Sequence, residues 1–254
     1  MTKTIFYDVD TQNDFMNKNG ALYVPNAENI KPNLENLTKY ACEQGIPIFG
    51  SVDRHFGTRE YKERELELSK WGGPFPDHCM DGTEGQRKIR ETLCGAFHSK
   101  NKLFLVSDAY IDNPLVNRVT LNYGVNKIKL NKNNLAKIIT DFFETSSNNE
   151  GAALTSGIFF EKQSYDVTTN PYFDKVMEAV KPEKVFVYGV ATDYCVKAAV
   201  KGLVKHAKEV YVITDTIKGI SEEGIKETFE EWKKIGVKLT TTKEVLGGAI
   251  WAEL

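Results

Sequence analysis

The chain alternates between two patterns of hydrophobic and polar residues. Short apolar runs are typical of buried strands, and they occur at 4–9, 47–52, 157–160, 184–190 and 209–214, with a weaker one near 237–241. Between most of them, apolar residues recur with the spacing of an amphipathic helix, over 26–44, 171–180, 194–207 and 221–235. Strands that alternate with helices are typical of a parallel sheet. We therefore predict an α/β fold: an open, mostly parallel sheet with helices on both faces.

The middle of the chain lacks this alternation. From Gly82 to about Ser156, asparagine and lysine become frequent, and the pattern indicates only a strand near 128–130 and an amphipathic helix near 134–144. The chain has no internal repeat and no low-complexity linker that would separate two domains. We therefore expect one domain over residues 1–254, with an insertion at about 86–155 that elaborates it.

Composition and charge narrow the class of protein. The 254 residues are 41% hydrophobic and 27% charged, and a net charge of −2 offers no basic field for nucleic acid. No apolar run approaches the roughly 20 residues that span a bilayer, and acidic residues interrupt the first apolar run, which argues against a signal peptide. Four cysteines show no disulfide-like spacing. We expect a cytoplasmic protein with free thiols and with neither a nucleic-acid nor a membrane partner.

Cys195 lies where the apolar run 184–190 turns into a helical pattern. At such a junction a thiol would be near the positive end of a helix dipole and near unpaired backbone N–H groups. These conditions favour a thiolate and can hold an oxyanion. The alternative is a small hydrophobic residue in the core, which is the commoner role of an isolated cysteine.

Two further charged residues follow predicted strands. Asp10 comes after the first strand, and ligands of open parallel sheets bind beyond such carboxyl ends. It is therefore a candidate catalytic carboxylate, although acids after strands also cap turns. Lys162 follows the strand at 157–160, where it could stabilise a thiolate or a carboxylate, or be a solvated surface lysine.

Asp53, His55 and His78 form a candidate metal site. Asp53 and His55 follow the second predicted strand, and residues two apart in an extended segment project to the same side. His78 would supply a third ligand from a returning loop. Two imidazoles and a carboxylate suit zinc, iron or manganese. Alternatively, both histidines are polar loop residues with ordinary hydrogen bonds.

Together these segments resemble the isochorismatase-like cysteine hydrolases, and within them the nicotinamidases. The matching pieces lie at predicted strand ends and in the family's order, at 9–15, 53–55, 76–85, 162 and 189–195. The resemblance covers residues 4–85 and about 156–242. It implies a Rossmann-like three-layer sandwich and an amide hydrolase that converts nicotinamide to nicotinate and ammonia in NAD metabolism, within pyridine nucleotide biosynthesis.

The resemblance also implies which residues act in catalysis. Asp10, Lys162 and Cys195 match the family's triad, in which the cysteine forms a thioacyl intermediate. The backbone N–H groups of Ala191 or Thr192 and of Cys195 would form the oxyanion hole, next to a Val190–Ala191 peptide bond that is commonly cis in the family. Aromatic residues that match the lining of the nicotinamide pocket are Phe15 and Phe75.

By the same resemblance, Asp53, His55 and His78 match the ligands of one divalent metal ion. Zinc is favoured, and iron or manganese would also accept this ligand set. Relatives often carry a further histidine or glutamate between the two histidines. The candidates in this chain are Glu60, Glu63, Glu65 and Glu67, of which we favour Glu65; water is the alternative.

Other functions fit the same residues less well. The unmatched insertion, and Phe75 where relatives often carry tryptophan, leave room for a different carboxamide or ureido substrate of a cysteine amidohydrolase. A non-catalytic interaction module would require a chemically competent triad to be idle. An isochorismatase is disfavoured because Cys195 and the metal-type cluster are both present. We therefore expect a small-molecule amide as the partner, and a homo-oligomer is compatible with the family.

Overall fold

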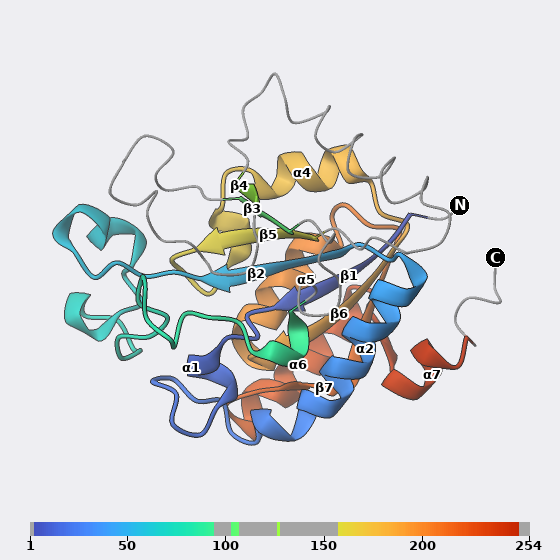
Figure 1. The fold of residues 1–254 in the computed structure, drawn as a ribbon, viewed down its shortest axis with the longest axis horizontal. Helices are drawn as coiled ribbons and strands as arrows, with labels where there is room; N and C mark the ends of the chain where they lie inside the picture. Colours follow the sequence, from blue (N-terminus) through green and yellow to red (C-terminus); the bar gives the residue numbers. More distant parts are fainter. Residues whose placement is uncertain (1–2, 94–102, 107–125, 128–156, 249–254) are drawn as a thin grey trace.

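The computed structural model describes residues 3–93, 103–106, 126–127 and 157–248. Within them one sheet runs through the middle of the molecule (Figure 1). Its strands are β1 (Thr4–Val9), β2 (Ile48–Asp53), β3 (Leu103–Val106), β4 (Asn126–Lys127), β5 (Gly157–Lys162), β6 (Lys184–Val190), β7 (Glu209–Lys218) and β8 (Lys238–Thr240). Neighbouring strands pair in parallel throughout this sheet, which confirms the predicted α/β class.

The strand order determines where a ligand can bind. The described strands form one 8-stranded sheet in the order β4-β3-β5-β2-β1-β6-β7-β8. The chain starts at β1, builds outward through β2, and later returns to the other side of β1 with β6. In open parallel sheets, ligands bind beyond the carboxyl ends of the strands where the order reverses. Here that place is the edge beyond β1 and β6.

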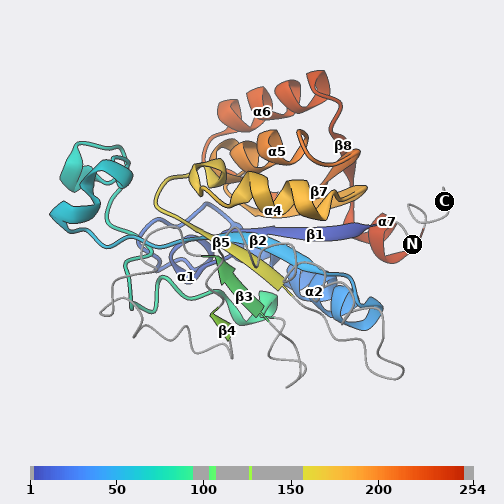
Figure 2. The ribbon, with the colours of Figure 1, turned by 90° about the horizontal axis from the view of Figure 1, so that it is seen from above.

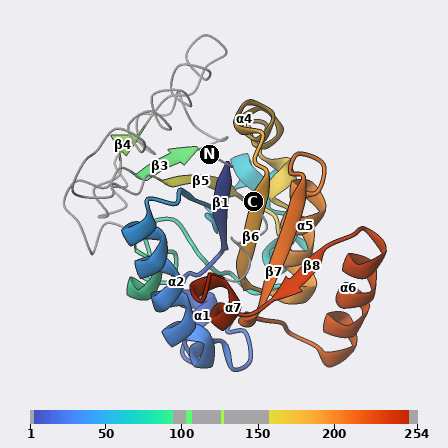
Figure 3. The same cartoon turned by 90° about the vertical axis from the view of Figure 1, so that its right-hand side faces the viewer.

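Helices cover both faces of this sheet (Figure 2 and Figure 3). One face carries α1 (Asn13–Met16), α2 (Lys31–Gln44) and α7 (Thr242–Leu246), and the other carries α4 (Phe173–Val180), α5 (Lys197–Leu203) and α6 (Glu222–Lys234). Short 3₁₀ turns are η1 (Ala27–Ile30), η2 (Arg59–Arg64), η3 (Ser69–Trp71), η4 (Arg90–Thr92) and η7 (Val167–Thr169), and one π turn, η8 (Thr192–Val196), follows β6. Among the described residues, no helix is both long and apolar enough to span a bilayer.

Each face of the sheet has its own apolar core, because successive side chains of a strand point to opposite faces. Ile5, Tyr7 and Val9 of β1 pack with residues of α4, α5 and α6, whereas Phe6 packs with residues of α1, α2 and α7. All of β6 is buried, which explains why it reads as a continuous apolar run.

Most predicted elements are present with shifted ends. The helix predicted over 26–44 divides into η1 and α2, and the helix predicted over 194–207 divides into η8 and α5. Within the predicted insertion, β3 and β4 extend the sheet beside β5. These strands were missed because they have four and two residues, too few to show a period. The strand at 128–130 and the helix at 134–144 lie outside the described residues, and the single domain stays a prediction.

A buried ion pair connects β1 to the segment that precedes the insertion. Asp8 is fully buried in β1, and the Lys88 Nζ lies 2.7 Å from its Oδ2. Thr11 Oγ1 donates to Asp8 Oδ1 at 2.9 Å and lies 2.7 Å from Thr92 Oγ1. A buried carboxylate needs such partners because it has lost its water. The network therefore fixes residues 88–92 against the end of β1, next to Asp10.

Replacing Lys88 with methionine should lower the free energy of unfolding by about 3–5 kcal/mol, because the Asp8 carboxylate is left buried without its counter-charge. Urea denaturation at neutral pH measures this loss. The double variant Asp8→Asn with Lys88→Met should recover much of it, since no charge is then buried. A double variant as unstable as Lys88→Met alone would contradict this account of the pair.

Candidate active site

Four side chains meet where four neighbouring strands end. Lys162 and Asp53 are the last residues of β5 and β2, Asp10 directly follows β1, and Cys195 lies in η8 after β6. Because β5, β2, β1 and β6 are adjacent and parallel, their carboxyl ends lie at one edge of the sheet. The structure therefore brings together the aspartate, lysine and cysteine that the sequence indicated.

Lys162 is at the centre of this group. Its Nζ lies 2.8 Å from Asp10 Oδ2 and 3.6 Å from Cys195 Sγ, and it also pairs with Asp53 Oδ1. The side chain is 1% exposed. Burial alone would lower the pKa of Lys162, but the charges of Asp10 and Asp53 outweigh it and hold that pKa well above its ordinary value. Lys162 is therefore a fixed positive charge.

The surroundings of Cys195 keep its thiol protonated at rest. Burial raises the pKa of Cys195, Lys162 opposes this, and the charges of Asp10 and Asp53 raise it further, so the pKa lies well above its ordinary value. The helix-terminus argument from sequence, which favoured a resting thiolate, is therefore outweighed by burial and by two carboxylates from other strands. The thiol needs a base before it can attack.

Asp10 is placed to be that base. One of its carboxylate oxygens and the Cys195 sulfur lie within 4.8 Å of each other. Burial raises the pKa of Asp10 despite the opposing charge of Lys162, and the charge of Asp53 adds to the rise. The Ser51 hydroxyl holds the carboxylate by donating to its Oδ1 at 2.7 Å. A carboxylate with a raised pKa beside a buried thiol is suited to proton transfer.

The turn that carries Cys195 begins at a cis peptide bond between Val190 and Ala191, as the resemblance implied. The Ala191 carbonyl accepts the N–H groups of Tyr194 and Val196, at 3.1 and 3.0 Å. Ala191 and Cys195 both line the same pocket. The oxyanion-binding role of their N–H groups stays a prediction.

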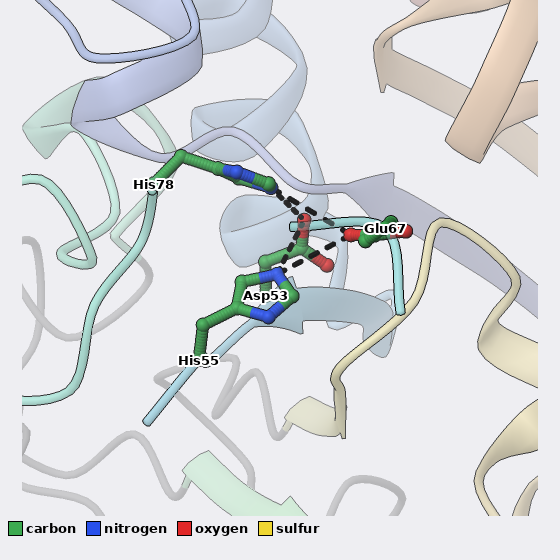
Figure 4. Close-up of side chains that lie close together, drawn as sticks. All are labelled: Asp53, His55, Glu67 and His78. Carbon is green, nitrogen blue, oxygen red and sulfur yellow. Dashed lines mark ion pairs between the residues drawn. The ribbon is translucent and has the colours of Figure 1, made fainter. Parts of the chain in front are cut away.

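Beside this group, four side chains could hold a metal ion (Figure 4). They are Asp53, His55, Glu67 and His78, each with one ligand atom within 4.8 Å of the others. His55 Nε2 lies 3.3 Å from Glu67 Oε1, and His78 Nε2 lies 3.5 Å from Asp53 Oδ2. The predicted Asp53, His55 and His78 are thus brought together, and Glu67 joins them.

The chemistry of these side chains fits a divalent metal. His55 is fully buried, yet neither of its ring nitrogens has a hydrogen-bond partner. A buried imidazole normally has such partners, and a metal would satisfy Nε2. The Nδ1 of His78 lies 2.8 Å from the Pro76 carbonyl, and this contact leaves its Nε2 lone pair free for a metal. Burial would raise the pKa of Asp53, but the charge of Lys162 is the largest effect that brings it below the ordinary value, so the carboxylate is ionised as a ligand must be.

The fourth side chain of the cluster is Glu67 and not the favoured Glu65. Both carboxylate oxygens of Glu65 accept backbone N–H groups, those of Phe56 and Gly57. Glu65 Oε1 lies 3.8 Å from His55 Nδ1, the ring nitrogen on the side away from the cluster contacts. Glu65 therefore shapes the loop that carries His55, and Glu67 replaces it as the candidate ligand.

A pocket of about 350 Å³, open mouth included, lies over these groups. The predicted Phe15 and Phe75 both line it, and each ring contacts His78, with centroids 5.5 and 6.2 Å apart. The other lining residues are Leu22, Val24, Glu67, Tyr165, Val190, Tyr194 and Ile220; of these, the sequence analysis named only Glu67, as a candidate metal ligand, and Val190, at the cis peptide bond. Tyr194 could have been predicted from the sequence, because it directly precedes Cys195. The carboxylate residues of the lining, Asp53 and Glu67, both belong to the metal-type cluster.

Gln12 is a further site residue whose role was missed. Its side-chain Nε2 donates to the carbonyl of Asp53 at 2.8 Å, and its Oε1 accepts the Asp53 N–H at 2.7 Å. The same Nε2 lies 2.6 Å from the carbonyl of Gln86. This buried carboxamide holds the backbone of Asp53, whose carboxylate faces both Lys162 and the imidazoles. The sequence did offer a signal for Gln12, because it lies between Asp10 and Asp14 in the segment 9–15 that matches the family.

Comparisons with known proteins bear on this arrangement. Residues 142–244 match the family model of the isochorismatase domain. The nicotinamidase of Escherichia coli (strain K12) is 23% identical over 252 residues, which cover 92% of either chain. The pyrazinamidase of Pyrococcus horikoshii, solved in complex with zinc, is 23% identical with a TM-score of 0.60, over 94% of this chain and 99% of that one. PnC1 from L. infantum, solved in complex with nicotinate, is 17% identical with a TM-score of 0.62, over 95% of this chain and 94% of that one. The predicted fold is confirmed.

Changing Glu67 to glutamine should weaken zinc binding by about 10–100-fold or more, because a carboxylate ligand is lost. Glu65→Gln should keep most of the metal but cost about 1–3 kcal/mol of stability, because one buried N–H loses its acceptor. The zinc content after dialysis against increasing concentrations of a chelator measures the zinc affinity of each variant, with His55→Ala as the metal-deficient reference. Equal loss of zinc in the two glutamine variants would contradict the assignment.

Proposed function

We propose that this chain is an isochorismatase-like hydrolase that converts nicotinamide to nicotinate and ammonia. The observation that carries the proposal is the position of Cys195. It lines one pocket with Asp53, Glu67 and His78 of the metal-type cluster, and its sulfur lies beside the buried Asp10–Lys162 pair. The nicotinamidase and pyrazinamidase relatives support the choice of a heteroaromatic carboxamide. Nicotinate as product would place the reaction in NAD salvage.

The proposed chemistry starts with Asp10 and Cys195. Asp10 takes the thiol proton as the sulfur attacks the carboxamide carbon, and the N–H groups of Ala191 and Cys195 hold the resulting oxyanion. Asp10 then gives the proton to the departing ammonia, which leaves a thioester on Cys195. Water hydrolyses the thioester and releases nicotinate. Lys162 keeps its charge throughout and holds Asp10 and the sulfur in register.

A divalent ion would be held by Asp53, His55, Glu67 and His78. Zinc is favoured, and iron or manganese would be accepted by the same ligands. When bound, the ion supplies a Lewis acid for the pyridine nitrogen of the substrate. The rings of Phe15 and Phe75, which border His78, would then flank the substrate.

The cell compartment is part of the same proposal. Cys79 and Cys195 are free buried thiols among the described residues. Free thiols are typical of reducing compartments. We therefore assign the reaction to the cytoplasm.

A second candidate is the same cysteine chemistry on another carboxamide or a ureido compound. The rim of the pocket supports this second candidate. Tyr165 and Ile220 line the pocket and are 45% and 38% exposed, so its mouth is open to substrates other than nicotinamide. Isochorismate is disfavoured as the substrate because Cys195 and the metal-type cluster are both present. A non-catalytic module is disfavoured because the chemically competent Asp10, Lys162 and Cys195 are brought together beside a pocket that Cys195 lines.

Purified protein loaded with zinc should release ammonia from nicotinamide, and Cys195→Ala should lower this rate by about 10⁴-fold or more, because the nucleophile is gone. The matched control is Cys42→Ala, which removes a buried thiol of α2 and should leave turnover intact. Retained turnover in Cys195→Ala would rule out the cysteine mechanism. If nicotinamide is inert, a panel of pyrazinamide, benzamide and ureido compounds decides for the second candidate.

A further inference from the structure

The carboxylate of Asp193 connects the nucleophile turn to the loop before α6. Asp193 lies in η8, two residues before Cys195. Its Oδ1 accepts the N–H of Ile220 at 2.9 Å, and its Oδ2 accepts the N–H of Ser221 at 3.0 Å. The Ser221 hydroxyl also donates to Oδ2, at 3.3 Å. Both oxygens of this carboxylate are therefore committed to one loop.

The loop is built around this carboxylate. A Cβ atom on Gly219 would lie 2.5 Å from Ile225 Cγ1 and 2.8 Å from Asp193 Oδ1, and one on Gly224 would lie 2.7 Å from Ser221 Oγ and 2.9 Å from Asp193 Oδ2. These distances are all shorter than real Cβ contacts, so a side chain at either glycine would displace the carboxylate or the loop. Neither glycine has an unusual φ among the described residues, so conformational freedom does not explain them. The close packing of Ile225, the Ser221 hydroxyl and the Asp193 carboxylate around them does.

The residue that this contact positions faces the pocket. Ile220 lines the catalytic pocket together with Tyr165, Tyr194 and Cys195, whereas Asp193 does not line it. Ile220 is nevertheless 38% exposed, so packing against the core holds it only in part. An isoleucine at a pocket mouth can bury its apolar surface only against a ligand. Its backbone N–H is held instead, by Asp193.

We propose that Asp193 is a positioning residue that fixes Ile220 as the outer wall of the pocket, and that Ile220 is a specificity-determining residue for flat aromatic amides. The inference rests on the proposed amide hydrolysis and deepens it. Ile220 covers the ring of the substrate, while Asp193 holds the wall at a set distance from the nucleophile turn. Because Asp193 holds residue 220 through its backbone N–H, the wall position does not depend on the identity of residue 220.

Steady-state kinetics with nicotinamide test the proposal. Asp193→Ala and Ile220→Ala should each raise KM about tenfold, the scale of a lost apolar contact in a pocket, with kcat nearly unchanged. The KM of the double variant should not exceed the higher KM of the two single variants, because the two residues act as one unit. Asp193→Asn, which keeps one acceptor oxygen, should be intermediate and serves if Asp193→Ala does not fold.

The matched control is Ser221→Ala. Ser221 caps α6 by accepting the Gly224 N–H, so this variant weakens the helix but leaves both backbone contacts of Asp193 in place. Its KM should not change. A raised KM in Ser221→Ala, KM effects of Asp193→Ala and Ile220→Ala that multiply, or a fall in kcat at constant KM in Asp193→Ala would each overturn the proposal.

Alkylation of Cys195 by iodoacetamide, followed by peptide mass spectrometry, separates this inference from the proposed function. A wild-type protein without nicotinamide turnover contradicts the function but leaves the alkylation readout intact. Opening the wall should speed alkylation to the same extent in Asp193→Ala, Ile220→Ala and the double variant. Unchanged alkylation in Asp193→Ala, or effects that multiply, would overturn the inference whatever the substrate is.

Discussion

The ammonium of Lys162 is the interaction on which the rest of the site depends. It is buried at the end of β5 and faces Asp10, Asp53 and Cys195 from three other strands. A buried ammonium is costly unless it is paired, and two carboxylates at this spacing would repel each other without a cation between them. The lysine and the acids are therefore stable only together. The strand order brings them together, and the charges in turn require the strand ends to stay in register.

Asp53 extends this dependence to the metal-type cluster. One of its oxygens pairs with Lys162, while the other faces His78 and His55. The Gln12 carboxamide bonds both the N–H and the carbonyl of Asp53. This fixes the Asp53 carboxylate between Lys162 and the two imidazoles. The nucleophile and the groups that would orient the substrate thus share one rigid sheet edge, which suits a reaction that needs fixed geometry.

The fold and most of the site could be predicted because their signals are local. Strand–helix alternation shows in the hydrophobic pattern, and Asp10, Asp53 and Lys162 stand directly at strand ends. Glu67 could not be chosen over Glu65, because both lie in irregular turns and the choice depends on which carboxylate captures the N–H groups of Phe56 and Gly57. The raised pKa of the Cys195 thiol was likewise beyond sequence, because carboxylates distant in the chain and the depth of burial cause it.

The central claim is that Cys195 forms a covalent acyl intermediate under the control of Asp10 and Lys162. Rapid-quench mass spectrometry of the protein mixed with excess nicotinamide tests it directly. The account predicts a nicotinoyl group on the Cys195 peptide that forms before nicotinate is released, with ammonia appearing first. Full turnover without acylation of Cys195, or acylation at another residue, would contradict it.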